Sequence, residues 1–172
     1  MVLLESLNLP LGAPAAGFSL EGVNGKIYGL DSFPEAKAII IVFMCNHCPY
    51  VQNIWCDLVE LQAKFGADGV QFLGVNPNTA NPEYEEETME KMQRYYQDYE
   101  MNFPYLEDPD QAVAKIYKAQ CTPDIYLFDG ERKLAYHGRI EELGDAIESV
   151  LAGKAVNVEQ KPSRGCSIKW VE

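Results

Sequence analysis

The chain of 172 residues lacks features that would place it in several common protein classes. It has only 14 lysine and arginine residues against 26 aspartate and glutamate residues, which gives a net charge of −12. Because nucleic acids and anionic membranes attract basic surfaces, this charge argues against both as partners. No stretch approaches the ~20 consecutive apolar residues needed to span a bilayer. The sequence also contains no internal repeat and no low-complexity tract.

The N-terminus lacks the features of a secretory signal. Its first eight residues, Met-Val-Leu-Leu-Glu-Ser-Leu-Asn, contain no basic region and no long apolar segment. We therefore expect a cytoplasmic protein. A chain of this length suits one compact domain, which buries roughly 70% of its unfolded surface. We predict a single domain over residues 1–172, with a hairpin at about 17–30 and a C-terminal tail at 154–172; the sequence indicates no oligomeric state.

Cysteine is scarce as well. The five cysteines are too few and too irregularly spaced for a disulfide scaffold. Cys45 and Cys48 form a C-x-x-C pair, but the second such pair that a zinc ribbon needs is missing. In a reducing compartment a lone C-x-x-C indicates redox or metal chemistry, and a surrounding β-α-β pattern favours the redox interpretation.

The residues around the pair have that pattern. An apolar run over 38–44 predicts a buried strand just before Cys45. Pro49 suits the first turn of a helix, and apolar residues then recur with helical spacing from Val51 to Phe65. Two thiols three residues apart can meet across such a first turn. Backbone N–H groups and the helix dipole would stabilise a thiolate there.

The rest of the chain continues the alternation of strands and helices. Asn24-Gly25 is a strong hairpin signal, and the acidic run 83–87 favours the start of a helix. The tail from residue 154 has no clear period. The other predicted elements are a strand at 70–75, a short helix at 111–118, paired strands at 124–128 and 134–138, and a last helix at about 145–151.

Three segments carry a family resemblance. They are residues 43–51 (FMCNHCPYV), 121–129 (CTPDIYLFD) and 165–170 (GCSIKW). Together they resemble the peroxiredoxin-like (redoxin, AhpC/TSA-related) branch of thioredoxin-fold thiol–disulfide oxidoreductases. The resemblance implies a three-layer thioredoxin-like α/β fold, whose central mixed sheet is flanked by helices and preceded by a β-hairpin. It also implies that Pro123 is cis and packs opposite the cysteine pair, with Thr122 and Pro123 meeting the substrate.

We interpret the pair as catalytic. Cys45 would be the attacking thiolate, because the N-terminal thiol of such a pair is usually the more exposed, and Cys48 would resolve the mixed disulfide. A cationic His47 between them would stabilise the thiolate and make the disulfide more oxidising. His137, in a late strand, would be structural. The expected substrate is a protein or low-molecular-weight disulfide or thiol, and nothing in the sequence demands an organic cofactor or a metal.

Two alternatives remain at this point. A thiol peroxidase would use Cys48-Pro49, although Cys45 stands where peroxiredoxins have a threonine and no arginine precedes the later strand. A metal or iron–sulfur module would use Cys45, Cys48, Cys121 and Cys166. Cys121 and Cys166 are candidate additional redox residues, with core packing as the other interpretation of each. Cys56 falls in the middle of a predicted helix, where we expect it to pack in the core.

Overall fold

The computed structural model describes residues 2–172. Its centre is a five-stranded mixed sheet in the order β6-β5-β4-β8-β9. Strands β4, β5 and β6 are parallel, whereas β8 is antiparallel to β4 and β9 is antiparallel to β8. In chain order the strands are β4 (Ala38–Phe43), β5 (Val70–Asn76), β6 (Tyr105–Glu107), β8 (Asp124–Phe128) and β9 (Leu134–Gly138). The sequence prediction is confirmed for all but β6, which is only three residues long and was missed.

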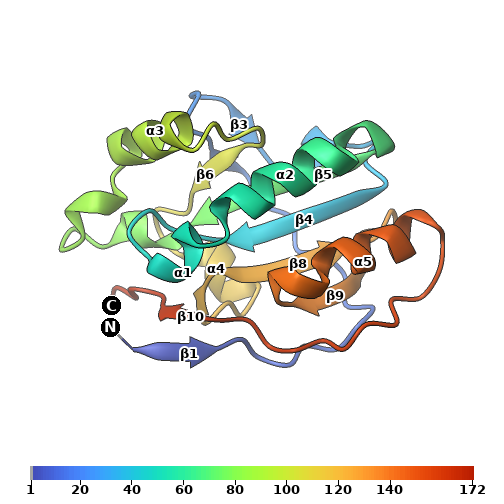
Figure 1. Ribbon diagram of the computed structural model, residues 1–172. Helices are drawn as coiled ribbons and strands as arrows, with labels where there is room; N and C mark the ends of the chain where they lie inside the picture. The colour runs from blue at the N-terminus through green and yellow to red at the C-terminus, as the bar shows by residue number, and fades with distance from the viewer. Residues whose placement is uncertain (1) are drawn as a thin grey trace.

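Helices cover both faces of this sheet (Figure 1). One face packs against α1 (Pro49–Gln52), α2 (Trp55–Phe65), α3 (Met89–Asp98) and α5 (Ile140–Leu151). The other face packs against α4 (Ala112–Ile116) and apolar residues of the N-terminal segment. All six residues of β4 are buried, as expected for a central strand that is covered on both sides. The expected three-layer α/β fold is therefore confirmed.

The predicted hairpin is present. Strands β2 (Leu20–Glu21) and β3 (Ile27–Tyr28) pair antiparallel around a turn in which Gly25 has a φ of 78°. A side chain other than glycine would be strained in that conformation. Short 3₁₀ turns at Leu30–Ser32, Gly66–Asp68, Pro77–Ala80 and Glu85–Glu87 connect other elements. Within residues 2–172, no helix has the length and apolar character required to cross a membrane.

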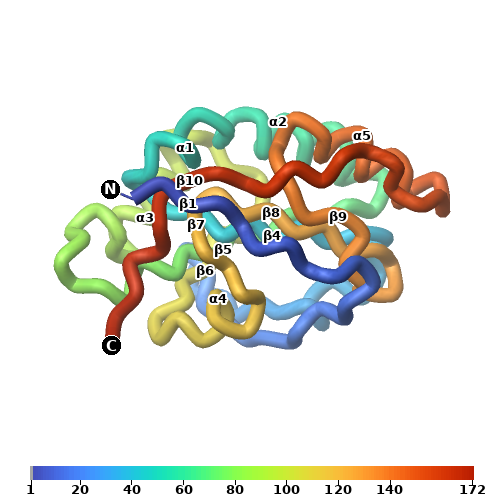
Figure 2. The backbone as a smooth tube through the Cα atoms, turned by 90° about the horizontal axis from the view of Figure 1, so that it is seen from below, coloured from blue at the N-terminus to red at the C-terminus, as the bar shows by residue number. Residues whose placement is uncertain are grey.

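The C-terminal tail is more ordered than the sequence predicts. It forms β10 (Arg164–Ser167), which lies between β1 (Leu3–Glu5) and β7 (Cys121–Thr122) in a second, antiparallel sheet. Figure 2 shows β1 and β10 running side by side, with β7 next to them and α1 close to β10. In this register Cys166 lies opposite Thr122. The tail thereby reaches the end of the main sheet at which Cys45 and Cys48 lie.

Three helix boundaries differ from the prediction. The helix after Cys48 is interrupted because the N–H of Ile54 bonds to the carbonyl of Val51, which tightens the chain between α1 and α2. The acidic run forms a separate 3₁₀ turn, and α3 begins only after Thr88, whose hydroxyl caps it. Helix α5 begins at Ile140, before the predicted start at about residue 145. Its packing against the sheet overrides the weak helix propensity of Gly144.

Candidate active site

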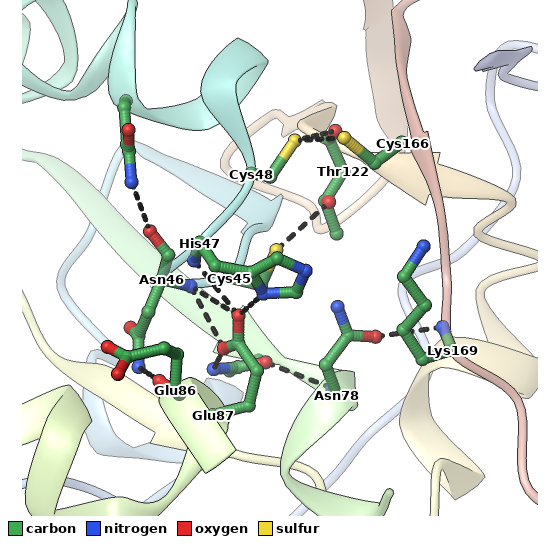
Figure 3. A network of polar contacts seen from close by, with 12 residues as sticks. Cys45, Asn46, His47, Cys48, Asn78, Glu86, Glu87, Thr122, Cys166 and Lys169 are labelled. Carbon is green, nitrogen blue, oxygen red and sulfur yellow. Dashed lines mark hydrogen bonds and ion pairs between the residues drawn. The ribbon is translucent and has the colours of Figure 1, made fainter. Parts of the chain in front are cut away.

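Three segments that are distant in sequence bring their thiols and a proline together (Figure 3). Cys45 follows the end of β4, and Cys48 is the residue immediately before α1. The Thr122–Pro123 peptide bond between β7 and β8 is cis, which confirms the expectation from the resemblance. Cys166 approaches from β10, the strand that pairs with β7.

The sulfur atoms of all three cysteines lie close to Thr122 or to one another. The Sγ atoms of Cys48 and Cys166 are 2.7 Å apart. The Cys45 Sγ lies 3.2 Å from the hydroxyl of Thr122, and the Cys48 Sγ lies 3.2 Å from the carbonyl oxygen of Thr122. No disulfide joins any cysteines within residues 2–172. The structure thus assembles three thiols around one threonine.

The expectation that Cys45 is exposed is wrong. The relative exposure of both Cys45 and Cys48 is 0%, and that of Cys166 is 2%. Helix α1 packs against β10, so the pair is enclosed between the start of the helix and the C-terminal strand. A substrate larger than water therefore reaches these sulfurs only if part of this enclosure moves.

The thiol that favours deprotonation is Cys48. A hydrogen bond with Cys45 lowers the pKa of Cys48 to about 5, and smaller contributions come from Cys166 and the backbone of Val51. Burial acts in the opposite direction but is outweighed. When protonated, Cys48 can donate to the carbonyl oxygen of Thr122. Its thiolate accepts four hydrogen bonds, from the thiols of Cys45 and Cys166 and from the backbone N–H groups of Val51 and Cys166. A thiolate at Cys48 is therefore the stable resting form of the reduced site.

Cys45 is in the opposite situation. Burial raises its pKa well above the usual value, and its hydrogen bond with Cys48 and the negative charge of Glu87 raise it further. The hydroxyl of Thr122 lowers the pKa, but less. Cys45 accordingly keeps its proton while Cys48 is ionised. This order is the reverse of the one predicted from the sequence.

His47 is tied to a buried carboxylate. Its Nδ1 contacts the Oε1 of Glu87 in a short hydrogen bond that is also an ion pair when the imidazole is protonated. This hydrogen bond raises the pKa of His47, and burial opposes it. The imidazole also stacks on Tyr84, with 5.4 Å between the ring centroids. A cationic His47 beside the thiols is consistent with the predicted tuning role.

Glu87 was not singled out from the sequence. Its carboxylate accepts hydrogen bonds from the backbone N–H groups of Asn46 and His47 and from the amide of Asn76. The hydroxyl of Tyr105 donates to the Asn46 side chain at 2.8 Å. These hydrogen bonds hold Asn46 and His47, the two residues between Cys45 and Cys48, in a fixed position. The acidic run around Glu87 was a signal, but it did not show which carboxylate turns inward.

The structure offers little to a metal ion. Within residues 2–172, the one cluster whose ligand atoms all lie within 4.8 Å of one another comprises Cys45, His47 and Glu87. The two carboxylate oxygens of Glu87 already accept several hydrogen bonds from N–H groups. Within the same residues (2–172), Cys45, Cys48, Cys121 and Cys166, the four ligands expected for an iron–sulfur module, do not form such a cluster. The Cys45, His47 and Glu87 side chains therefore suit a role in hydrogen bonding within the loop better than a role as metal ligands.

The remaining predicted residues have varied positions. Cys121 is buried, and its Sγ lies 3.7 Å from the carbonyl oxygen of Pro123, with burial raising the pKa of its thiol. Thr122 is buried and its hydroxyl faces Cys45 rather than solvent. His137 is structural as predicted, since its Nε2 lies 2.7 Å from a carboxylate oxygen of buried Asp124. Cys56 is exposed, so the expectation that it packs in the core is wrong.

A groove lies next to the cis proline. Its volume is about 260 Å³, and its walls include Tyr50, Ile54, Pro123, Arg139 and Arg164. Tyr50 is two residues beyond Cys48, and Pro123 adjoins Thr122, whose carbonyl oxygen contacts the Cys48 sulfur. The groove thus begins at residues that directly flank the thiols.

The chain is similar to known proteins in sequence and in structure. The sequence model of the AhpC/TSA family matches residues 11–137. The thiol-disulfide oxidoreductase ResA of Bacillus subtilis (strain 168) is 24% identical over 123 residues, which are 72% of this chain and 64% of ResA. The chain therefore matches less than two thirds of the length of that relative.

Two crystal structures extend the comparison. An uncharacterized conserved protein from Geobacillus kaustophilus is 38% identical, with a TM-score of 0.95 over 99% of this chain and 97% of that one. The thioredoxin domain of a thiol-disulfide oxidoreductase from Bacteroides vulgatus is 18% identical, with a TM-score of 0.71 over 84% of this chain and 99% of that one. The second likeness establishes the fold.

Proposed function

The chain belongs to the AhpC/TSA family and has the thioredoxin fold, and on that basis we propose that it is a thiol–disulfide oxidoreductase. In this proposal the protein cycles between a Cys45/Cys48 dithiol and a Cys45–Cys48 disulfide. The proposed substrate is a protein or low-molecular-weight disulfide, and the proposed compartment is the cytoplasm. The observation that carries the proposal is the thiolate-stabilising environment of Cys48, which adjoins both Cys45 and the cis Pro123 segment.

The proposed reaction begins at Cys48. Its thiolate attacks one sulfur of the substrate disulfide, which forms a mixed disulfide and releases the first substrate thiolate. Cys45 then loses its proton and attacks the Cys48 sulfur. The Cys45–Cys48 disulfide forms, and the second substrate sulfur leaves as a thiolate. This order exchanges the two roles predicted from the sequence, because the pKa of Cys48 is lowered and that of Cys45 is raised.

The neighbouring groups have distinct tasks in this scheme. A protonated His47 stabilises negative charge at the pair, and Glu87 keeps the imidazole in place and protonated. The groove beside Pro123 receives the substrate chain. Because both sulfurs are buried, the enclosure of α1 and β10 opens before the attack.

Variants at the two cysteines test the proposal. Cys48→Ser removes the thiolate and should abolish reduction of insulin disulfides. Cys45→Ser combined with Cys166→Ser keeps the Cys48 thiolate but removes both thiols that act on it, so the double variant should trap a mixed disulfide between Cys48 and the substrate. Cys56→Ser is the matched control and should retain full activity, because Cys56 lies on the exposed face of α2. Full insulin reduction by Cys48→Ser would overturn the proposal.

Thiol peroxidase activity is the second candidate, and the same thiolate favours it. Cys48 precedes Pro49 and has a pKa of about 5, both suited to attack on a peroxide. The segment Cys121-Thr122-Pro123 supplies no arginine to polarise the peroxide. We therefore rank this candidate second. Rapid consumption of hydrogen peroxide that depends on Cys48 and a thiol donor, without insulin reduction, would reverse the ranking.

A further inference from the structure

We propose that Cys166 is a second resolving thiol for Cys48, so that the site can close a Cys48–Cys166 disulfide as well as a Cys45–Cys48 disulfide. This proposal rests on the proposed function, because it starts from a mixed disulfide between Cys48 and a substrate. Its basis is the 2.7 Å contact between the two sulfurs, which come from positions 118 residues apart in the sequence.

The fold holds Cys166 in this position. Strand β10 is paired on both sides, with Cys166 opposite Leu3 of β1 and Thr122 of β7. Gly165 permits an unusually close approach, because a Cβ atom there would lie 1.9 Å from the carbonyl oxygen of Thr122. That same carbonyl is 3.2 Å from the Cys48 sulfur. A side chain at position 165 would collide with this carbonyl, so the close approach of β10 to Thr122 requires glycine there.

The proposed step balances without an external oxidant. Cys48 is first joined to one substrate sulfur by a disulfide bond. Cys166 loses its proton and attacks the Cys48 sulfur, which forms the Cys48–Cys166 bond and breaks the bond to the substrate. The substrate sulfur leaves as a thiolate and takes up a proton. The two electrons that reduce the substrate disulfide come from Cys48 and Cys166.

The electrostatics of Cys166 suit this sequence of events. Burial, together with the hydrogen bond and the negative charge of Cys48, raises the pKa of Cys166 to about 12, and Lys169 acts in the opposite direction. In the resting state Cys166 therefore keeps its proton and stabilises the Cys48 thiolate. When Cys48 enters a mixed disulfide, its negative charge is gone. Cys166 then loses its proton more readily, at the moment when a second nucleophile is needed.

The other cysteines are less suitable partners. The Sγ of Cys121 lies 3.7 Å from the carbonyl oxygen of Pro123 and 3.9 Å from that of Ser163, on the other side of β7 from Thr122. Cys56 is exposed on α2. Cys166 is thus the cysteine outside the C-x-x-C motif whose sulfur contacts Cys48.

The test uses the Cys45→Ser/Cys56→Ser protein, in which Cys48 is the remaining cysteine of the tryptic peptide 38–64. The protein is treated with glutathione disulfide, quenched with N-ethylmaleimide and analysed by mass spectrometry. We expect glutathione to be released and peptide 38–64 to be linked to peptide 165–169, which contains Cys166. The matched control adds Cys166→Ser, and there we expect glutathione to remain on Cys48. Diamide, a small two-electron oxidant of thiols, should give the same link if glutathione disulfide enters the site slowly.

The outcomes separate this proposal from the proposed function. Stable glutathione on Cys48 while Cys166 is present would overturn the role of Cys166, as would a link to peptide 119–132, which contains Cys121. Absence of any link after diamide treatment would also overturn it. The Cys166→Ser single variant reports on the proposed function instead. Formation of an internal Cys45–Cys48 disulfide in that variant supports the proposed function whatever the fate of Cys166.

Discussion

Glu87 binds His47 across a separation of 40 residues in the sequence. The carboxylate of Glu87 is buried, whereas the imidazole of His47, a residue within the C-x-x-C motif, is partly exposed. Glu87 therefore does more than balance a charge, because it also accepts the N–H groups of the loop that carries Cys45 and Cys48. This relationship gives the first prediction.

Glu87→Gln should lower the pKa of His47, because the hydrogen bond with Glu87 is the largest cause of its raised value. The pKa is raised by folding, so a protonated His47 stabilises the fold fully below its unfolded pKa of ~6.5. This stabilisation is lost as pH rises through the folded pKa. NMR titration of the His47 imidazole in the wild type and in the variant measures the shift. An unchanged His47 titration in the variant would contradict the role of Glu87.

The reduced protein should contain a thiolate that titrates at about pH 5 and belongs to Cys48. Folding lowers this pKa below the ~8.5 of an ordinary thiol, so the stabilisation is complete above that value and is lost as pH falls towards 5. Thiolate absorbance at 240 nm followed against pH measures it. The transition should disappear in Cys48→Ser and persist in Cys56→Ser. A first thiolate that appears only above pH 8 would disprove the assignment.

His47→Asn should raise the pKa of Cys48 and make the Cys45–Cys48 couple more reducing. The reason is that a cation near the pair favours the thiolate, and His47 and Cys48 interact electrostatically. Each tenfold change in the exchange equilibrium corresponds to about 30 mV for this two-electron couple. Equilibration of variant and wild type in the same glutathione buffers measures the difference. Equal potentials would remove His47 from the tuning of the pair.

Gly165→Ala should destabilise the protein by about 3 kcal/mol, because the new Cβ atom would overlap the carbonyl oxygen of Thr122. Gly17→Ala is the matched control, since a Cβ there meets no atom within 4 Å. Urea unfolding of the reduced proteins measures both changes. A Gly165→Ala protein as stable as the control would show that β10 does not need this close approach.

Much of the fold could be predicted from local patterns. The continuous apolar run of β4 and the helical spacing after Pro49 locate the cysteine pair at the junction of a strand and a helix. Asp129-Gly130 between two apolar runs similarly predicts the pairing of β8 with β9. These signals succeed because burial on both faces of a strand produces a continuous apolar run, whereas burial on one face of a helix produces a periodic one.

The features that were missed depend on distant partners. Strands β1, β7 and β10 have three, two and four residues, too few to show a period, and β10 is ordered by pairing with both of the others. The inward turn of Glu87 depends on N–H groups near residue 46. The burial of Cys45 depends on residues that are distant in the sequence, including Cys166 of β10, which belongs to the same buried cluster. None of these contacts leaves a local sequence pattern.

The most direct test of the account is the redox titration of Cys45 and Cys48 in the Cys166→Ser protein. The protein, with and without prior treatment with a metal chelator, is equilibrated in buffers of varied glutathione ratio, and the internal disulfide of peptide 38–64 is quantified by mass spectrometry. The account predicts a reversible two-electron transition confined to Cys45 and Cys48. A pair that stays reduced at every ratio, or that oxidises only after a metal ion is stripped from it, would contradict the central claim.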